Sequence, residues 1–139
     1  MVWRLKYVKA PFGPYAETLR HVLKSIEGYF VSGYADGGDT PNKEIELVPG
    51  AIKDASSLIA HDAEIRQRFD RVANLVEGFE TPFGLELLAT VHWVATREYA
   101  STRAEVLNLT YAWNERKKRF SERQIDLAYE RLKSRGWLQ

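Results

Sequence analysis

Apolar side chains recur every three or four residues through most of the chain, and this spacing predicts amphipathic helices. The first predicted helix follows the proline- and glycine-rich turn at residues 10–15 and ends at Gly28. Helical spacing resumes at Ala51, and Asp62 is placed to cap a further helix that stops at Gly78. The apolar face of this further helix is predicted from Ile65, Phe69, Val72 and Val76.

The segment Gly78–Trp93, which reads GFETPFGLELLATVHW, contains the most apolar of the predicted helices. One face carries Leu85, Leu88, His92, Ala95 and Tyr99, and Leu87, Val91 and Val94 lie beside that face. The remaining, partly polar stripe consists of Glu86, Thr90, Trp93 and Arg97. A helix with so little polar surface is predicted to run through the core.

Two more helices are predicted near the C-terminus, because each is preceded by the signature of a capping box. The first signature is Thr102-Arg103-Ala104-Glu105 and the second is Ser121-Glu122-Arg123-Gln124. In the last helix, Gly136 is placed as the C-terminal cap and Trp137 is placed to fold back on the helix end. The core face of this helix is predicted to be Ile125, Ala128, Tyr129 and Leu132.

Short strands are predicted where apolar and polar side chains alternate. Residues 2–8 show this alternation, and residues 29–31 and 45–48 are further candidates, separated by a glycine- and aspartate-rich turn region at 33–42. The pattern therefore predicts a mostly helical α+β fold, with short N-terminal strands, a helical core and a C-terminal winged-helix-like module of three helices. We expect residues 1–139 to form a single domain.

Composition narrows the class of protein. The chain has 139 residues, of which 45% are hydrophobic and 28% charged, as in an ordinary globular protein. Its formal net charge is only +1, so any electrostatic role must be local. There is no cysteine, no apolar run long enough to cross a membrane and no signal peptide pattern. We therefore expect a cytoplasmic protein with no membrane association.

Candidate catalytic chemistry is sparse. His21, His61 and His92 are the histidines, and none stands at the spacing of a paired metal site. No phosphate-binding or nucleophile motif occurs, so we predict no metal and no cofactor. A hydrolase that uses His92 with Glu86 or Glu80 has no nucleophile or oxyanion motif to support it. We predict that the chain is not an enzyme.

The most acidic segment lies in the turn region. Between residues 36 and 46, Asp36, Asp39, Glu44 and Glu46 stand against Lys43, a local charge of −3. We interpret this segment as an exposed loop.

A basic segment gives an alternative function. Residues 115–135 hold eight basic and four acidic side chains, a local charge of +4 that includes Arg116-Lys117-Lys118-Arg119. With the predicted winged-helix-like module, this segment favours nucleic-acid binding. Against that reading, no wing hairpin follows the last helix, and a basic run between two helices is typically a solvated connection.

Three phrases together resemble the C-terminal region of DarG-type antitoxins: PFGPYAETLRHVL at 11–23, ELVPGA at 46–51 and GFETPFGLELLATVHW at 78–93. In this family of bacterial toxin–antitoxin systems, an N-terminal macrodomain removes ADP-ribose from DNA bases. The C-terminal domain binds the partner toxin DarT, a DNA ADP-ribosyltransferase, and inhibits it. The resemblance implies a chain that holds the toxin-binding part and lacks the macrodomain.

The resemblance also implies where the partner binds. A toxin that holds single-stranded DNA needs a basic groove that accepts bases, and an acidic surface with exposed rings would occupy such a groove. We expect Pro11, Gly13, Gly78 and Gly84 to set backbone turns and not to contact the partner. The partner-binding candidates are Tyr34, Asp36, Asp39, Glu44, Glu46, Glu80 and Phe83.

Overall fold

A computed structural model describes residues 5–33 and 44–139. The chain divides into two compact units, and each is described by itself. Unit 1 contains residues 16–69, together with the end of the chain before residue 8, and unit 2 contains residues 8–15 and 70–139. Helix α3 (Ala63–Val76) contributes its first half to unit 1 and its second half to unit 2. The single-domain prediction stays a prediction.

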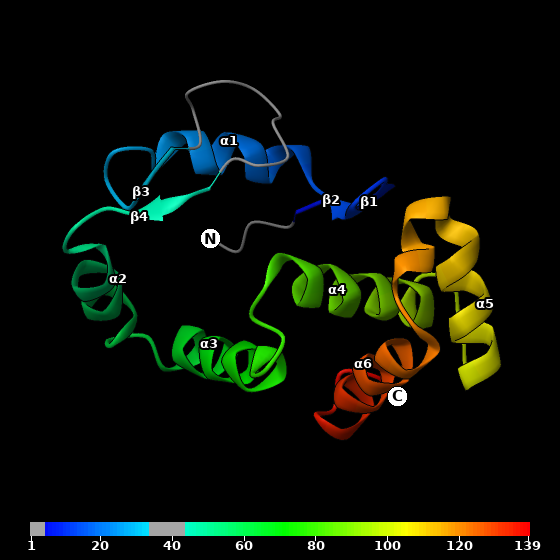
Figure 1. The fold of residues 1–139 in the computed structure, drawn as a ribbon. Helices are drawn as coiled ribbons and strands as arrows, with labels where there is room; N and C mark the ends of the chain where they lie inside the picture. The colour runs from blue at the N-terminus through cyan, green and yellow to red at the C-terminus, as the bar shows by residue number, and fades with distance from the viewer. Residues whose placement is uncertain (1–4, 34–43) are drawn as a thin grey trace. The chain divides into compact units, whose positions relative to one another are not determined.

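Unit 1 is built from short elements (Figure 1). Strands β3 (Val31–Ser32) and β4 (Glu46–Leu47) pair in antiparallel register, Val31 with Leu47 and Ser32 with Glu46. Gly33, which follows β3, has a φ of 88°, and a Cβ atom there would come within 2.7 Å of the Glu44 carbonyl oxygen, so this position requires glycine. Besides these strands, unit 1 contains α1 (Glu17–Ser25), α2 (Ala51–Ile59) and the start of α3.

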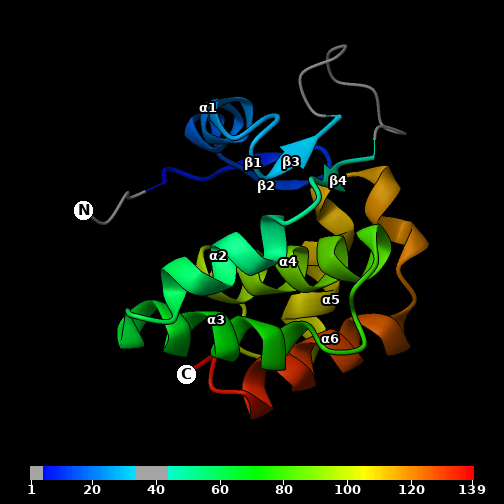
Figure 2. The same ribbon diagram turned by 90° about the vertical axis from the view of Figure 1, so that its left-hand side faces the viewer.

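Unit 2 combines an N-terminal hairpin with the helices of the second half of the chain (Figure 2). The hairpin pairs Val8 with Tyr15 and Ala10 with Gly13. Its strand β2 (Gly13–Tyr15) contacts α4 (Pro82–Thr96), and α4 in turn contacts α5 (Arg103–Trp113) and α6 (Glu122–Ser134). The remaining elements of unit 2 are β1 (Val8–Ala10), the end of α3 and the 3-10 helix η1 (Glu115–Arg119).

The core of unit 2 surrounds α4, as its apolar sequence predicts. Val91 and Val94 of α4 are completely buried, and Val106, Phe120 and Ile125 close around them from the following elements. The predicted mostly helical α+β class is therefore confirmed, and so is the core position of this helix. Within the described residues, no helix has both the length and the apolar character that crossing a bilayer requires.

The local signals for helix ends are also confirmed. Both capping boxes form, one from Thr102 with Glu105 and one from Ser121 with Gln124. At the end of α6, Gly136 has a positive φ, and the backbone N–H of Trp137 donates to the Leu132 carbonyl at 2.8 Å. Trp137 therefore folds back on the helix.

Three expectations are wrong because tertiary contacts decide what spacing alone leaves open. Residues 5–7 form no strand, and the first strand begins at Val8; residues 1–4 lie outside the described residues. On α3, only Leu75 is buried, whereas Ile65, Phe69 and Val72 are exposed. On α4, Leu85 is exposed and Tyr99 lies beyond the end of the helix with 85% of its surface open to solvent.

Candidate functional site

A single carboxylate near the start of α4 organises the polar interior of unit 2. The side chain of Glu86 is only 10% exposed, and it accepts hydrogen bonds from three cations of η1. Lys117 Nζ donates to Oε1 at 2.7 Å, and Arg116 Nη2 donates to Oε2 at 3.2 Å. Arg119 Nη2 also donates to Oε2. We call these four residues the Glu86 cluster.

Lys117 is completely buried, which is rare for a lysine and tolerable only when the charge is paired. Its ammonium also lies over two rings, 5.1 Å from the centroid of Trp113 and 5.7 Å from that of Phe120. Burial lowers the pKa of Lys117, against the opposing effect of the Glu86 carboxylate. The Glu86 cluster thus joins α4 to η1 through an ion pair shielded from water.

The pKa of Glu86 is lowered as well. Burial acts to raise it, but the hydrogen bonds from Lys117 and Arg116 and the charges of Lys117 and Arg119 outweigh burial. In the unfolded chain this carboxyl has the ordinary value of 4.5, so as pH falls the unfolded state binds the proton first. Stability that depends on the ionised Glu86 is therefore present above that value and is lost as pH falls below it.

We therefore expect the free energy of unfolding to decrease below about pH 4.5. Urea unfolding of the parent and of Glu86→Gln, followed from pH 7 to pH 3, checks this. The carboxyl of Glu105, whose pKa is lowered by its hydrogen bonds to Ser101 and Thr102, is present in both proteins and cancels in the difference. The difference in free energy of unfolding between the parent and Glu86→Gln should become smaller as pH falls. A difference that stays constant over this pH range would contradict a lowered pKa for Glu86.

The residues around η1 also hold the N-terminal hairpin. Trp113 Nε1 donates to the Ala10 carbonyl and Asn114 Nδ2 donates to the Pro11 carbonyl, each at 2.9 Å. The Arg116 guanidinium lies 4.5 Å from the ring centroid of Phe12. The turn between β1 and β2 is therefore fixed to the end of α5 by its backbone, which leaves the ring of Phe12 57% exposed.

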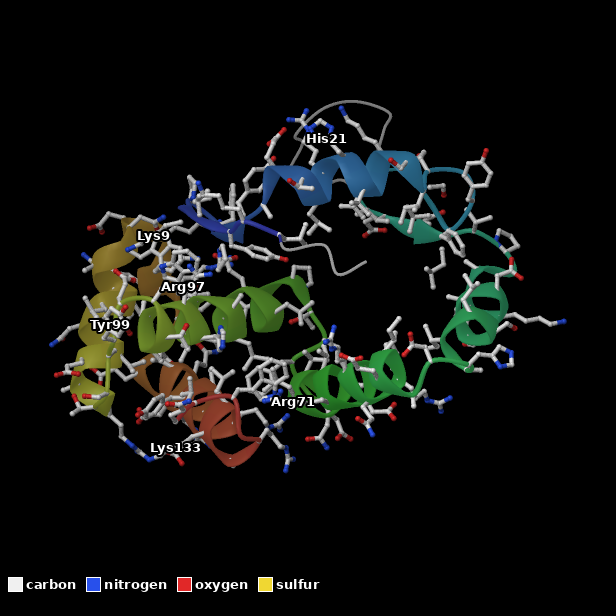
Figure 3. The ribbon with its side chains drawn as sticks, turned by 180° about the vertical axis from the view of Figure 1, so that it is seen from behind. Lys9, His21, Arg71, Arg97, Tyr99 and Lys133 are labelled. Atoms are coloured by element: carbon white, nitrogen blue, oxygen red, sulfur yellow. The ribbon has the colours of Figure 1, made fainter. Side chains whose placement is uncertain are left out.

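Cations lie over aromatic rings at several further positions of unit 2. Lys9 Nζ is 4.6 Å from the centroid of Trp113, and Arg97 is 5.1 Å from that of Trp93. The two tryptophans meet edge to face at 6.2 Å, and Lys9 also pairs with Glu98 at 3.1 Å. Figure 3 shows Lys9, Arg97 and Tyr99 along the same edge, beside α5. We define the cation–ring surface as Lys9, Phe12, Trp93, Arg97, Tyr99, Trp113, Arg116 and Arg119. To these we add Lys118, the most exposed cation of η1, which lies over no ring of the described residues and pairs with Glu115.

Of the partner-binding candidates in the turn region, the structure describes Glu44 and Glu46, which belong to unit 1. Tyr34, Asp36 and Asp39 lie outside the described residues. Glu44 and Glu46 are exposed, and Glu46 begins β4. Their apolar neighbours Ile45 and Leu47 are exposed too, and so is Tyr29. The described part of this region therefore combines exposed carboxylates with exposed apolar side chains.

The other two candidates, Glu80 and Phe83, lie in unit 2. Glu80 is exposed in the turn before α4. Phe83 is half-buried, with its ring edge to face against Phe120 at a centroid distance of 5.0 Å and Arg119 above it. The contacts with Phe120 and Arg119 account for the position of Phe83 in the fold. Its role in binding a partner stays a prediction.

The basic segment does not form a solvated connection. Residues 115–119 fold as η1, with Lys117 buried and Arg116 and Arg119 bound to Glu86. On α6, Asp126 and Glu130 pair with Arg103, at 3.6 and 2.7 Å. The exposed charges of α6 thus include both signs, and the basic character of the segment is concentrated at η1.

His92 is half-buried on α4, where it meets the ring of Trp137 edge to face at 6.2 Å. Burial and the charge of Arg97 lower its pKa, so the imidazole is neutral near pH 7. Glu86, its proposed hydrolase partner, is instead bound to the cations of η1. Over residues 5–33 and 44–139, no three histidine or carboxylate side chains gather as a metal ion requires.

The sequence did not reveal the Glu86 cluster or the cation–ring surface. One signal was available, because Glu86 is a carboxylate in the most apolar helix and such a residue needs a partner. The stripe of Glu86, Thr90 and Trp93 faces protein and not solvent, since Thr90 is completely buried and Trp93 contacts Trp113.

Comparison with known proteins identifies the family of the chain. It is 40% identical over 135 residues to a DNA ADP-ribosyl glycohydrolase of Thermus aquaticus, an alignment that covers 97% of this chain. It is 37% identical over 134 residues to proteins of the same name from Mycobacterium bovis and Mycobacterium tuberculosis, covering 92% of this chain. The chain corresponds to one region of a DarG-type protein. The resemblance stated from the sequence is thus confirmed.

This DarG-type region is only part of its relatives. The alignments cover 37% of the Thermus protein and 38% of each mycobacterial protein, so the chain spans little more than a third of their length. No protein-family model matches the chain. The activity in the name of these relatives belongs to the whole proteins.

Proposed function

We propose that this DarG-type region binds a DarT-type DNA ADP-ribosyltransferase toxin and inhibits it by binding, without a metal, a cofactor or catalysis of its own. The observation that supports this is the similarity to DarG-type proteins over almost the whole chain, at 37–40% identity. In a family that combines a catalytic macrodomain with a toxin-binding region, a chain without the glycine-rich loops of a macrodomain fits the second part.

In this proposal, unit 1 supplies the acidic surface that enters the DNA groove of the toxin. The segment from residue 36 to residue 46 carries a formal charge of −3. At its described end, Glu44 and Glu46 alternate with the exposed side chains of Ile45 and Leu47. Carboxylates attract a basic groove, and apolar side chains fill the space that bases would occupy. Tyr34, Asp36 and Asp39 belong to the same proposed surface.

The direct test mixes purified chain and toxin and measures their association in moderate salt by size-exclusion chromatography with light scattering. We expect a one-to-one complex. In a transfer assay, an excess of the chain should stop ADP-ribosylation of single-stranded DNA by the toxin. ADP-ribose already on that DNA should stay attached when the chain alone is added. No association at micromolar concentrations, or release of ADP-ribose by the chain, would refute the proposal.

Charge reversal tests the proposed surface. We expect the double variant Glu44→Lys, Glu46→Lys to bind the toxin at least about tenfold more weakly, because attraction to the groove becomes repulsion. The control, Glu77→Lys with Glu122→Lys, changes the formal charge equally at exposed positions of unit 2. Isothermal titration calorimetry of both variants gives the comparison. Equal affinities for the two would remove the 44–46 segment from the interface.

A further inference from the structure

We propose that the cation–ring surface of unit 2 binds a single strand of nucleic acid. This inference does not rest on toxin binding, since it concerns a different set of residues and the chain by itself. Its starting point is the charge of the surface. Lys9, Arg97 and the four cations of η1 stand against the carboxylates of Glu86, Glu98 and Glu115, which leaves a formal excess of +3.

The cations are accessible as well as in excess. Lys117 is buried and takes no part, but the side chains of Lys9, Arg116, Lys118 and Arg119 are between 35% and 55% exposed. Arg97 is exposed too. Each guanidinium has five N–H donors, and Arg116 and Arg119 each use one terminal nitrogen on Glu86. The remaining donors suit phosphate oxygens, which arginine binds with its planar fork.

The structure holds these cations in place before a ligand arrives. Arg116 lies over Phe12 at 4.5 Å, Arg119 over Phe83 at 5.1 Å, and Lys9 over Trp113 at 4.6 Å. Ring contacts and the carboxylate of Glu86 restrict the rotamers of these long side chains. Less conformational entropy is then lost when a phosphate binds.

Two aromatic rings on this surface are open to solvent. Phe12 projects from the turn of the hairpin and is 57% exposed. Tyr99 is 85% exposed and has a φ of 60°, a left-handed conformation that glycine usually supplies after a helix. The Ala100 N–H closes the helix end by donating to the Val94 carbonyl at 3.0 Å. The helix end thus leaves the ring of Tyr99 in solvent, directly after Glu98, which pairs with Lys9.

Accessible cations interleaved with rings are the combination that binds single strands, because phosphates meet the charges and unpaired bases stack on the rings. A duplex keeps its bases stacked inside and gains nothing from the rings. An acidic peptide meets the cations but has no need of Phe12 or Tyr99. The exposed charges of α6 are of both signs, so this helix is poorly suited to follow a duplex groove. The observations therefore favour a single strand.

The test uses the 139-residue chain and a fluorescein-labelled oligothymidylate, with binding followed by anisotropy at several salt concentrations. If three or four cations meet phosphates, the logarithm of the binding constant should fall with the logarithm of salt with a slope of about −2 to −3. Unlabelled duplex of equal length and polyglutamate are the competitors. We expect single-stranded competitor to displace the probe best. Undetectable binding, or equal displacement by duplex or polyglutamate, would overturn the proposal.

Paired variants locate the site. The double variant Phe12→Ala, Tyr99→Ala should weaken strand binding at least about fivefold, the loss that a single base-stacking ring produces. Arg97→Gln with Lys118→Gln should make the salt slope shallower by about 1.4, since each phosphate contact contributes about 0.7. The control Arg123→Gln, Leu127→Ala removes an exposed cation and an exposed apolar side chain from α6. Circular dichroism verifies that the two test variants and the control all fold. If the control weakens strand binding as much as the test variants do, the proposed site is refuted.

Discussion

Replacing Glu86 by alanine is expected to lower the free energy of unfolding by about 3–5 kcal/mol, the usual result of removing one partner of a buried ion pair. The loss exceeds that of one hydrogen bond because Lys117 stays behind, completely buried and without its carboxylate. Arg116 and Arg119 lose the same acceptor, which removes the ionic contacts between η1 and α4. Urea unfolding at pH 7, followed by tryptophan fluorescence and circular dichroism, measures the change.

Two further variants test the explanation. Glu115 is 88% exposed and pairs with Lys118, so Glu115→Ala should change stability by less than about 1 kcal/mol. The double variant Glu86→Leu, Lys117→Met removes both buried charges and should recover part of the loss. If Glu86→Ala costs no more than Glu115→Ala, the Glu86 cluster does not stabilise unit 2 as we describe.

Replacing Gly84 by alanine is expected to cost about 1–3 kcal/mol, as insertion into a packed region does. A Cβ atom at Gly84 would lie 2.5 Å from the Phe79 carbonyl oxygen and 2.9 Å from the carbonyl carbon, both of them backbone atoms. Alanine favours helices more than glycine does, by about 0.5–1 kcal/mol, so the contact must overcome a gain in propensity. Thermal and urea unfolding of the variant show directly whether its free energy of unfolding is lower or higher than that of the parent.

The matched control is an exposed position in a neighbouring helix. Asn108 lies on α5 and faces solvent, so Asn108→Ala should leave stability unchanged or raise it by up to about 0.5 kcal/mol. A Gly84→Ala variant as stable as its parent would mean that the turn before α4 adjusts freely. The presence of glycine at position 84, the last residue of the phrase GFETPFG, would then need an explanation other than packing.

The sequence predicted the features that depend on neighbours along the chain. Asp62, Thr102 and Ser121 stand at helix starts where their side chains accept from the backbone, and all three do so in the structure. Gly136 and Trp137 end α6 as expected, because a helix stop is a local event. Strand β4 lies within the predicted range 45–48, whereas β3 shares only Val31 with the predicted range 29–31.

The features that depend on distant partners were not predictable in this way. The burial of Lys117 follows from Glu86, thirty-one residues earlier, and no spacing rule connects the two. Tyr99 continues the helical spacing of α4, but the helix ends at Thr96 and leaves its ring in solvent. For Ile65, Phe69 and Val72, apolar spacing gave a helix correctly and its burial wrongly. Periodicity describes a helix and does not say what covers it.

Unit 2 is discontinuous in sequence, and this has a consequence for folding. The hydrogen bond from Trp113 to Ala10 joins residues 103 positions apart, whereas α4, α5 and α6 follow one another closely along the chain. Closing so long a loop costs entropy that the hairpin contacts must repay, and contacts of large sequence separation slow folding. We therefore expect the three helices to form before the hairpin docks. The surface that carries Phe12 is then expected to be completed last, although its hairpin is synthesised before the three helices.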